Sequence, residues 1–148
     1  MKTLMSGAGA LCAGLCAALA AAAPASADQW EDEVLAQLLV VGLALDGEGW
    51  ELDREIVVDS LGAGESDMFS FKTEPGVEYA LIGVCDTDCA DLDMTLFDKQ
   101  GNFLTEDAAT DDAPVLQFVA LKGKYRLGVS MYHCAVEPCR YGVALFSN

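Results

Sequence analysis

Two stretches near the end of the chain decide its fold: Lys124-Tyr-Arg-Leu-Gly-Val-Ser-Met-Tyr132 and Arg140-Tyr-Gly-Val-Ala-Leu-Phe146. In both, large apolar residues occupy every second position. Successive side chains of a β-strand point to opposite faces, so this period of two predicts strands with one buried face. The alternating apolar residues are Tyr125, Leu127, Val129 and Met131 in the first stretch, and Tyr141, Val143 and Leu145 in the second.

Similar short runs precede these two stretches, and turn signals rich in Gly, Pro and Asp separate them. They predict strands at 55–60, 67–73, 77–85, 92–98 and 115–120. Seven or eight short strands at this spacing are typical of an antiparallel β-sandwich or jelly roll. We therefore expect a mainly β protein in which residues 48–148 form a single domain.

One segment ahead of the strands has a helical pattern. Asp28 followed by Glu31 fits a helix N-terminus, and Gly47 and Gly49 end the pattern, so we predict a helix at 28–47. One apolar stripe comprises Trp30, Val34, Leu38, Val41 and Leu45, and a second set, Leu35, Leu39, Val40 and Leu43, extends it almost all round. A helix this apolar must be covered by its own domain or by a partner, and both interpretations stay open.

The first 27 residues have the pattern of a signal peptide. Lys2 supplies a positive start, residues 11–23 form an apolar stretch, and Ala25-Ser-Ala27 is a small-residue cleavage site. The apolar stretch is shorter than the roughly 20 residues that span a bilayer. We predict cleavage after Ala27, a periplasmic or secreted protein, and no membrane span after cleavage.

The predicted mature chain is strongly acidic, with 24 Asp and Glu against seven Lys and Arg, a net charge of −17. This charge excludes nucleic-acid binding, which needs a basic surface. Cationic partners, metal ions and neutral polymers remain compatible with it. Solubility alone also explains such a charge.

All four cysteines of the predicted mature chain occur as two close pairs: Cys85 with Cys89, and Cys134 with Cys139. An even number of cysteines in an exported chain indicates disulfides. Three connectivities are open; loop-closure entropy favours bridges between the pairs, whereas the spacing favours Cys85–Cys89 and Cys134–Cys139. Zinc held by four thiolates is the alternative, although zinc ligands usually pair as C-x2-C.

The first cysteine pair lies in a run of aspartates, Cys85-Asp-Thr-Asp-Cys-Ala-Asp-Leu-Asp93. A disulfide across four steps would turn the chain back and bring Asp86 and Asp88 together, with Asp91 and Asp93 just downstream. Crowded carboxylates repel, and oxygen ligation of a hard cation relieves that repulsion. These four aspartates are therefore the candidate Ca²⁺ ligands, and Ca²⁺ is the candidate cofactor; a solvated acidic loop is the alternative.

Tyr132 stands directly before His133, the only histidine of the chain, and packing in the core or at its rim is the ordinary role for such a tyrosine. Tyr132 is the candidate ligand-binding aromatic, because its ring could stack on a sugar or a peptide. His133 has no evident nucleophile or orienting partner, and no G-x-S-x-G motif is present. We expect no enzymatic activity and no catalytic residue.

Four motifs carry a resemblance to a known family: Ser66-Asp-Met-Phe-Ser-Phe71, Gly76-Val-Glu-Tyr79, Asp91-Leu-Asp-Met-Thr-Leu-Phe-Asp98 with Gly101, and Gly123-Lys-Tyr-Arg-Leu-Gly-Val129. Residues 64–146 resemble the bacterial pre-peptidase C-terminal domain family. The resemblance implies a jelly roll without catalysis of its own, usually appended to secreted enzymes. Some members of this family bind calcium and others bind polymers.

Two functions follow from these observations. The first is an exported, non-enzymatic binding or accessory module, stabilised by calcium, that recognises a polymer (a glycan or a peptide) or a component of the cell envelope. The alternative is an interaction protein that docks through its N-terminal helix onto another exported protein.

Overall fold

The computed structural model describes residues 27–121 and 123–148. The signal peptide predicted for residues 1–27 lies, apart from Ala27, outside the described residues. The described chain forms one helix and eight strands: α1 (Ala27–Asp46), β1 (Glu51–Leu61), β2 (Ser66–Thr73), β3 (Glu78–Cys85), β4 (Cys89–Phe97), β5 (Phe103–Asp107), β6 (Val115–Val119), β7 (Gly123–Cys134) and β8 (Cys139–Ser147). Within these residues, no helix has the length and apolar character that crossing a membrane requires.

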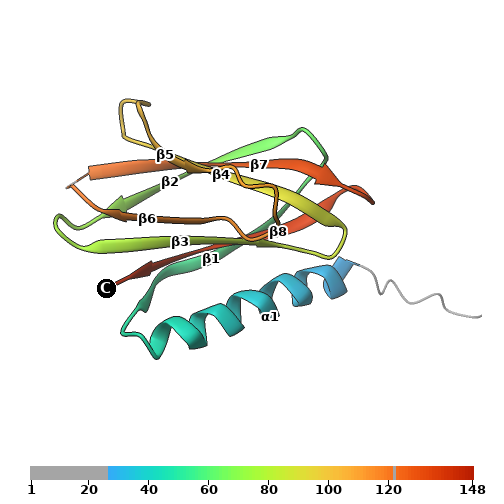
Figure 1. Cartoon of the computed structure of the whole chain (residues 1–148), viewed down its shortest axis with the longest axis horizontal. Helices are drawn as coiled ribbons and strands as arrows, with labels where there is room; N and C mark the ends of the chain where they lie inside the picture. Colours follow the sequence, from blue (N-terminus) through green and yellow to red (C-terminus); the bar gives the residue numbers. More distant parts are fainter. Residues whose placement is uncertain (1–26, 122) are drawn as a thin grey trace, which may run out of the picture.

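The strands form two four-stranded antiparallel sheets that face each other (Figure 1). Their orders are β1-β8-β3-β6 and β2-β7-β4-β5. The pairs β1–β8, β2–β7, β3–β6 and β4–β5 are those of one long hairpin with its turn between β4 and β5. Winding this hairpin on itself adds the pairs β3–β8 and β4–β7. This arrangement is a jelly roll, and the predicted fold class is confirmed.

The main core lies between the two sheets and consists of the alternating residues that the sequence pattern predicted. It includes the fully buried Leu127, Val129 and Met131 of β7 and Tyr141 of β8. The strand β5 was not expected as a separate strand. Its five residues are exposed or half-buried, so it has no buried face to produce a period of two.

The helix α1 packs on the outer face of the β1-β8-β3-β6 sheet (Figure 1). Val34 and Leu38 are buried there against apolar residues of β3 and β8. Gly142 of β8 permits this approach, because a Cβ at that position would lie 2.5 Å from Val34 Cγ1 and 2.8 Å from Leu38 Cδ1. The predicted helix is confirmed, and the stripe of Val34 and Leu38 is covered by the chain's own domain.

Candidate functional site

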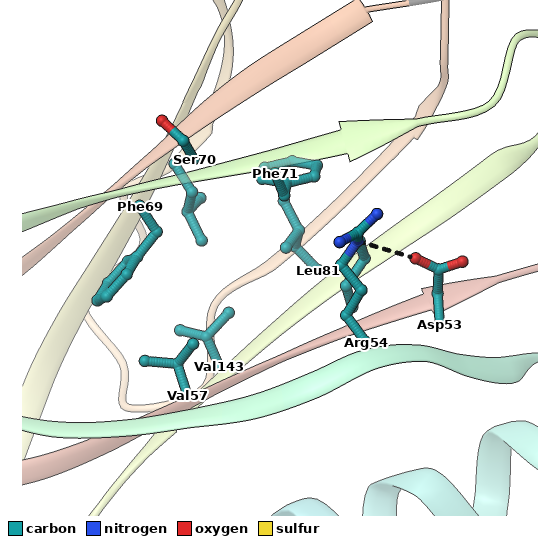
Figure 2. A pocket seen from close by; sticks show the side chains of 10 residues that line it. Asp53, Arg54, Val57, Phe69, Ser70, Phe71, Leu81 and Val143 are labelled. Atoms are coloured by element: carbon teal, nitrogen blue, oxygen red, sulfur yellow. Dashed lines mark ion pairs between the residues drawn. The ribbon is translucent and has the colours of Figure 1, made fainter.

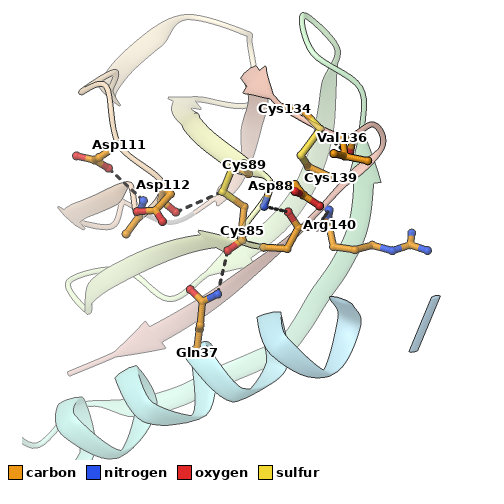
Figure 3. The surroundings of a disulfide bond; sticks show 12 residues. Gln37, Cys85, Asp88, Cys89, Asp111, Asp112, Cys134, Val136, Cys139 and Arg140 are labelled. Atoms are coloured by element: carbon orange, nitrogen blue, oxygen red, sulfur yellow. Dashed lines mark hydrogen bonds between the residues drawn. A yellow bond between two sulfur atoms is a disulfide. The ribbon is translucent and has the colours of Figure 1, made fainter. Parts of the chain in front are cut away.

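Both disulfides lie at the same end of the sandwich (Figure 3). They join Cys85 to Cys89 and Cys134 to Cys139, with Cα–Cα distances of 5.9 and 5.8 Å. This is the predicted local pairing, and it uses the four thiolates that zinc would need. Each bridge is short in sequence, yet each links the end of a strand in one sheet to the start of a strand in the other. The two bridges therefore hold the sheets together at this end.

Asp86 has a structural position within the first disulfide loop. Its side chain is buried, and each of its carboxylate oxygens accepts one backbone hydrogen bond. The N–H of Asp88 donates to Oδ1 at 3.2 Å, and the N–H of Arg140 donates to Oδ2 at 2.6 Å. The loop is further tied to the helix, because Gln37 Nε2 donates to the Cys85 carbonyl at 2.9 Å (Figure 3). Asp86 thus joins the β3–β4 turn to β8.

The candidate calcium ligands Asp91 and Asp93 lie farther along β4, and acids from the following segment approach them. Burial raises the pKa of Asp93, and the nearby carboxylates of Asp91, Asp107, Glu106 and Asp111 raise it further. Asp93 Oδ1 is enclosed and accepts no hydrogen bond from the described residues. No group of three or more His, Cys, Asp and Glu side chains is arranged for metal binding in the described part of the chain. Calcium binding by Asp86, Asp88, Asp91 and Asp93 stays a prediction.

Tyr132 lies on β7 with 63% of its surface exposed, beside a shallow hollow formed by residues 64–66 and 130–131. Ser66 and Ser130 share a hydrogen bond of 2.8 Å in this hollow. His133 is also exposed and stands opposite Asp91 in the strand register. The ring of Tyr132 is therefore accessible for stacking, and its role in binding stays a prediction.

A pocket opens at the seam between β1 and β2, which are edge strands of the two sheets (Figure 2). Its volume is about 490 Å³. Phe69 of β2 points toward Val57 and Val143 of the opposite sheet, and Phe71 lies on the side of Leu81 and Arg54 (Figure 2). The remaining apolar walls are Val57, Leu81, Leu127, Val143 and Leu145. A cavity of this size with mostly apolar walls is typical of a ligand-binding site.

Three residues that line this pocket are polar: Ser70, and the partly exposed Asp53 and Arg54. Arg54 Nε lies 3.4 Å from Asp53 Oδ2, and Arg54 Nη2 donates to the Lys72 carbonyl of β2 at 3.2 Å. The Asp53–Arg54 ion pair is partly exposed, so its contribution to stability is small. The guanidinium therefore remains able to pair with a polar or anionic end of a ligand whose apolar part fills the pocket.

The strand β1 explains why the seam is open at this point. Its pairing with β8 is regular from Val57 to Leu61 but has two irregularities on either side of Arg54. Each irregularity inserts an extra residue and bends the edge strand. Sequence reasoning missed this pocket. The alternation of Phe69 and Phe71 was visible as a strand pattern, whereas the bulges depend on the register with β8.

Comparisons with known proteins bear on the fold. No family model and no curated protein matches the sequence. The solved pre-peptidase C-terminal domain of a collagenase from Bacillus anthracis is similar over 62% of this chain and 87% of that one, with 17% identity and a TM-score of 0.49. A periplasmic inhibitor of g-type lysozyme from Aeromonas hydrophila is similar over 64% of this chain and 85% of that one, with 12% identity and a TM-score of 0.47. The first is a domain of the kind that residues 64–146 resemble in sequence, and both likenesses concern the fold alone.

Proposed function

We propose that this chain is an exported, non-enzymatic binding domain that recognises a polymer or a component of the cell envelope. The observation that carries this proposal is the pocket between β1 and β2, with its apolar walls and its single cation at the mouth. Its ligand is a group with an apolar body and a polar or anionic end, such as an aromatic residue of a peptide or a substituted sugar. Tyr132 provides a second contact for an extended ligand.

Export supports this proposal on two grounds. The first 27 residues have the sequence of a cleavable signal peptide, and the two disulfides are stable in an oxidising compartment. Because the disulfides hold the two sheets at one end, a ligand can enter the seam while the sandwich keeps its shape.

Calcium bound by the aspartates of β4 would stabilise the domain without taking part in recognition.

A fluorescent probe with an apolar body and a sulfonate, anilinonaphthalene sulfonate, tests the pocket directly. We expect the probe to bind with increased emission, and Val57→Trp to abolish binding by filling the pocket. Arg54→Gln should weaken the probe's affinity several-fold, because it removes the cation at the mouth. Binding that is unchanged in Val57→Trp would contradict the proposed site. A glycan and peptide array, read with the same variants, then identifies the ligand.

A further inference from the structure

The helix α1 has a second apolar face, which points away from the sheet. Leu39, Val40 and Leu43 are 63%, 67% and 67% exposed, and Leu35 is also exposed. The leucines at 35, 39 and 43 are four residues apart, so they form one strip along about 12 Å of the helix. Among the described residues, no helix or strand lies over the side of α1 that faces away from the sheet (Figure 1). Single exposed leucines are ordinary on protein surfaces, but a contiguous strip usually marks an interaction site.

Two hollows continue this strip on either side of the helix. One is an apolar groove between α1 and the end of β3, where Val40 and Val41 face Val84 and Ala113. The other lies between α1 and the start of β1, where Leu39 and Leu43 face Trp50 and Leu52. The strip with its flanking hollows forms a ridge between two grooves, a shape that receives the side chains of a second helix.

The charge around the strip determines what can cover it. Residues 27–53 contain eight Asp and Glu and no Lys, Arg or His. Glu31 and Asp32 are exposed at the start of α1, and Asp46 and Glu48 are exposed at its end. A second copy of this chain would place like charges against each other at both ends, whether the two helices ran parallel or antiparallel. An anionic membrane surface would be repelled in the same way.

We propose that the outer face of α1 is a docking surface for a cationic amphipathic helix of another exported protein. The partner helix inserts apolar side chains along the strip of Leu35, Leu39 and Leu43, and its Lys and Arg residues pair with the carboxylates at the two ends of α1. The proposal goes beyond the pocket between β1 and β2 and is independent of it. The inner face of α1, with Val34 and Leu38, stays packed on the sheet throughout.

The test uses the protein purified from the periplasm of an expression host and a synthetic 18-residue peptide of Leu and Lys with its leucines on one helical face. Calorimetry should give measurable binding to the wild type. Leu39→Ser/Leu43→Ser should raise the dissociation constant roughly tenfold or more, because truncated anchor side chains dominate such losses. Met68→Ser/Phe103→Ser is the matched control, since these exposed apolar residues lie on the opposite sheet and should leave binding unchanged.

Two further peptides separate the apolar strip from simple charge attraction. A scrambled Leu–Lys peptide of the same composition should bind at least tenfold more weakly, and a Leu–Glu peptide with the original pattern should not bind. Equal affinity for the scrambled peptide, or for the Leu39→Ser/Leu43→Ser variant, would overturn the proposal. So would sedimentation showing a dimer of the wild type that this variant dissociates, because the strip would then be covered by a second copy. Binding to phosphatidylcholine vesicles that the variant loses would equally overturn it in favour of a lipid surface.

Discussion

Two neighbouring leucines of α1 allow a direct test of how the helix is held. Leu38 is 2% exposed and faces β8, whereas Leu39 is 63% exposed and faces outward. Leu38→Ala and Leu39→Ala are the same substitution, so they change the helix propensity by the same amount. They differ in the buried area that is lost, because only the Leu38 side chain is buried. Leu38→Ala removes three buried carbons, which at about 0.8 kcal/mol each corresponds to about 2.4 kcal/mol of lost transfer free energy. The cavity left behind brings the expected loss to about 3 kcal/mol.

This loss should be evident in thermal unfolding. The unfolding entropy of a domain of about 120 residues is about 0.25 kcal/mol/K, so Leu38→Ala should lower Tm by about 12 °C. Leu39→Ala should stay within about 2 °C of the wild type, because exposed substitutions change stability by about 0.5 kcal/mol or less. Circular dichroism melts and urea titrations of both variants measure the difference. Equal Tm values for the two variants would refute the packing of α1 on the sheet.

The same contact can be tested from the sheet. Gly142→Ala places a methyl group where Val34 and Leu38 already lie, which should cost about 1–3 kcal/mol. Gly128→Ala is the matched control on β7, where the nearest atoms to a new Cβ are 3.5 Å away. A loss confined to Gly142→Ala and Leu38→Ala would locate the contact from both of its sides.

Three further results are expected. Asp86→Ala leaves two half-buried backbone N–H groups without acceptors and should lower the free energy of unfolding by about 2 kcal/mol in urea titrations, while Asp88→Ala in the same loop should have little effect. The pKa of Asp93 is higher in the folded protein than in the unfolded chain, so ionisation of this carboxyl opposes folding above its ordinary pKa. Asp93→Asn should therefore raise Tm at pH 7. The gain should vanish below about pH 3.5, where Asp93 is protonated in both the folded and the unfolded state. Millimolar CaCl₂ added to chelator-treated protein should raise Tm and release or absorb heat, and Asp91→Asn/Asp93→Asn should remove both effects; no heat and no rise in the wild type would end the calcium hypothesis.

The sandwich could be predicted because its buried strands each carry a local signal. The inner residues of β7 alternate with less buried ones, so their burial was evident without knowledge of their partners. Both faces of β8 are buried, because α1 covers the outer face, and the alternation indicated only the inner one. β5 had no such signal, because it is an edge strand and its place is set by pairing of residues 103–107 with β4. The helix was equally evident, and the predicted stripe that contains Val34, Leu38, Val41 and Leu45 is the face that meets the sheet. The sequence could not show that the chain's own sheet would cover this stripe, because the close contact requires Gly142, which is distant in sequence.

The candidate sites were harder to predict, because they depend on contacts between distant residues. Spacing correctly predicted the Cys85–Cys89 bridge, but not the direction in which Asp86 would turn. Asp86 accepts a hydrogen bond from Arg140, 54 residues away, so its role in the fold has no local signal. The pocket likewise forms from residues of both sheets at a bulged edge. Local patterns predict strands and turns, whereas the sites require the register between strands.

The distribution of charge gives a last prediction about how a partner would approach. The charged residues of segment 27–53, which comprises α1 and the start of β1, are all acidic. Lys72, Lys124 and Arg126 lie instead on the outer side of β2 and β7, in the opposite sheet. A cationic helix is therefore attracted to the side of α1 before contact, which raises its association rate. Neutralising Glu31, Asp32 and Asp46 together should slow association of the Leu–Lys peptide in stopped-flow measurements at low salt. Neutralising three exposed acids elsewhere, Glu65, Glu74 and Glu106, removes the same three negative charges but should slow association less. Equal slowing would mean that net charge alone attracts the peptide, and that the position of the acids around α1 has no part in recognition.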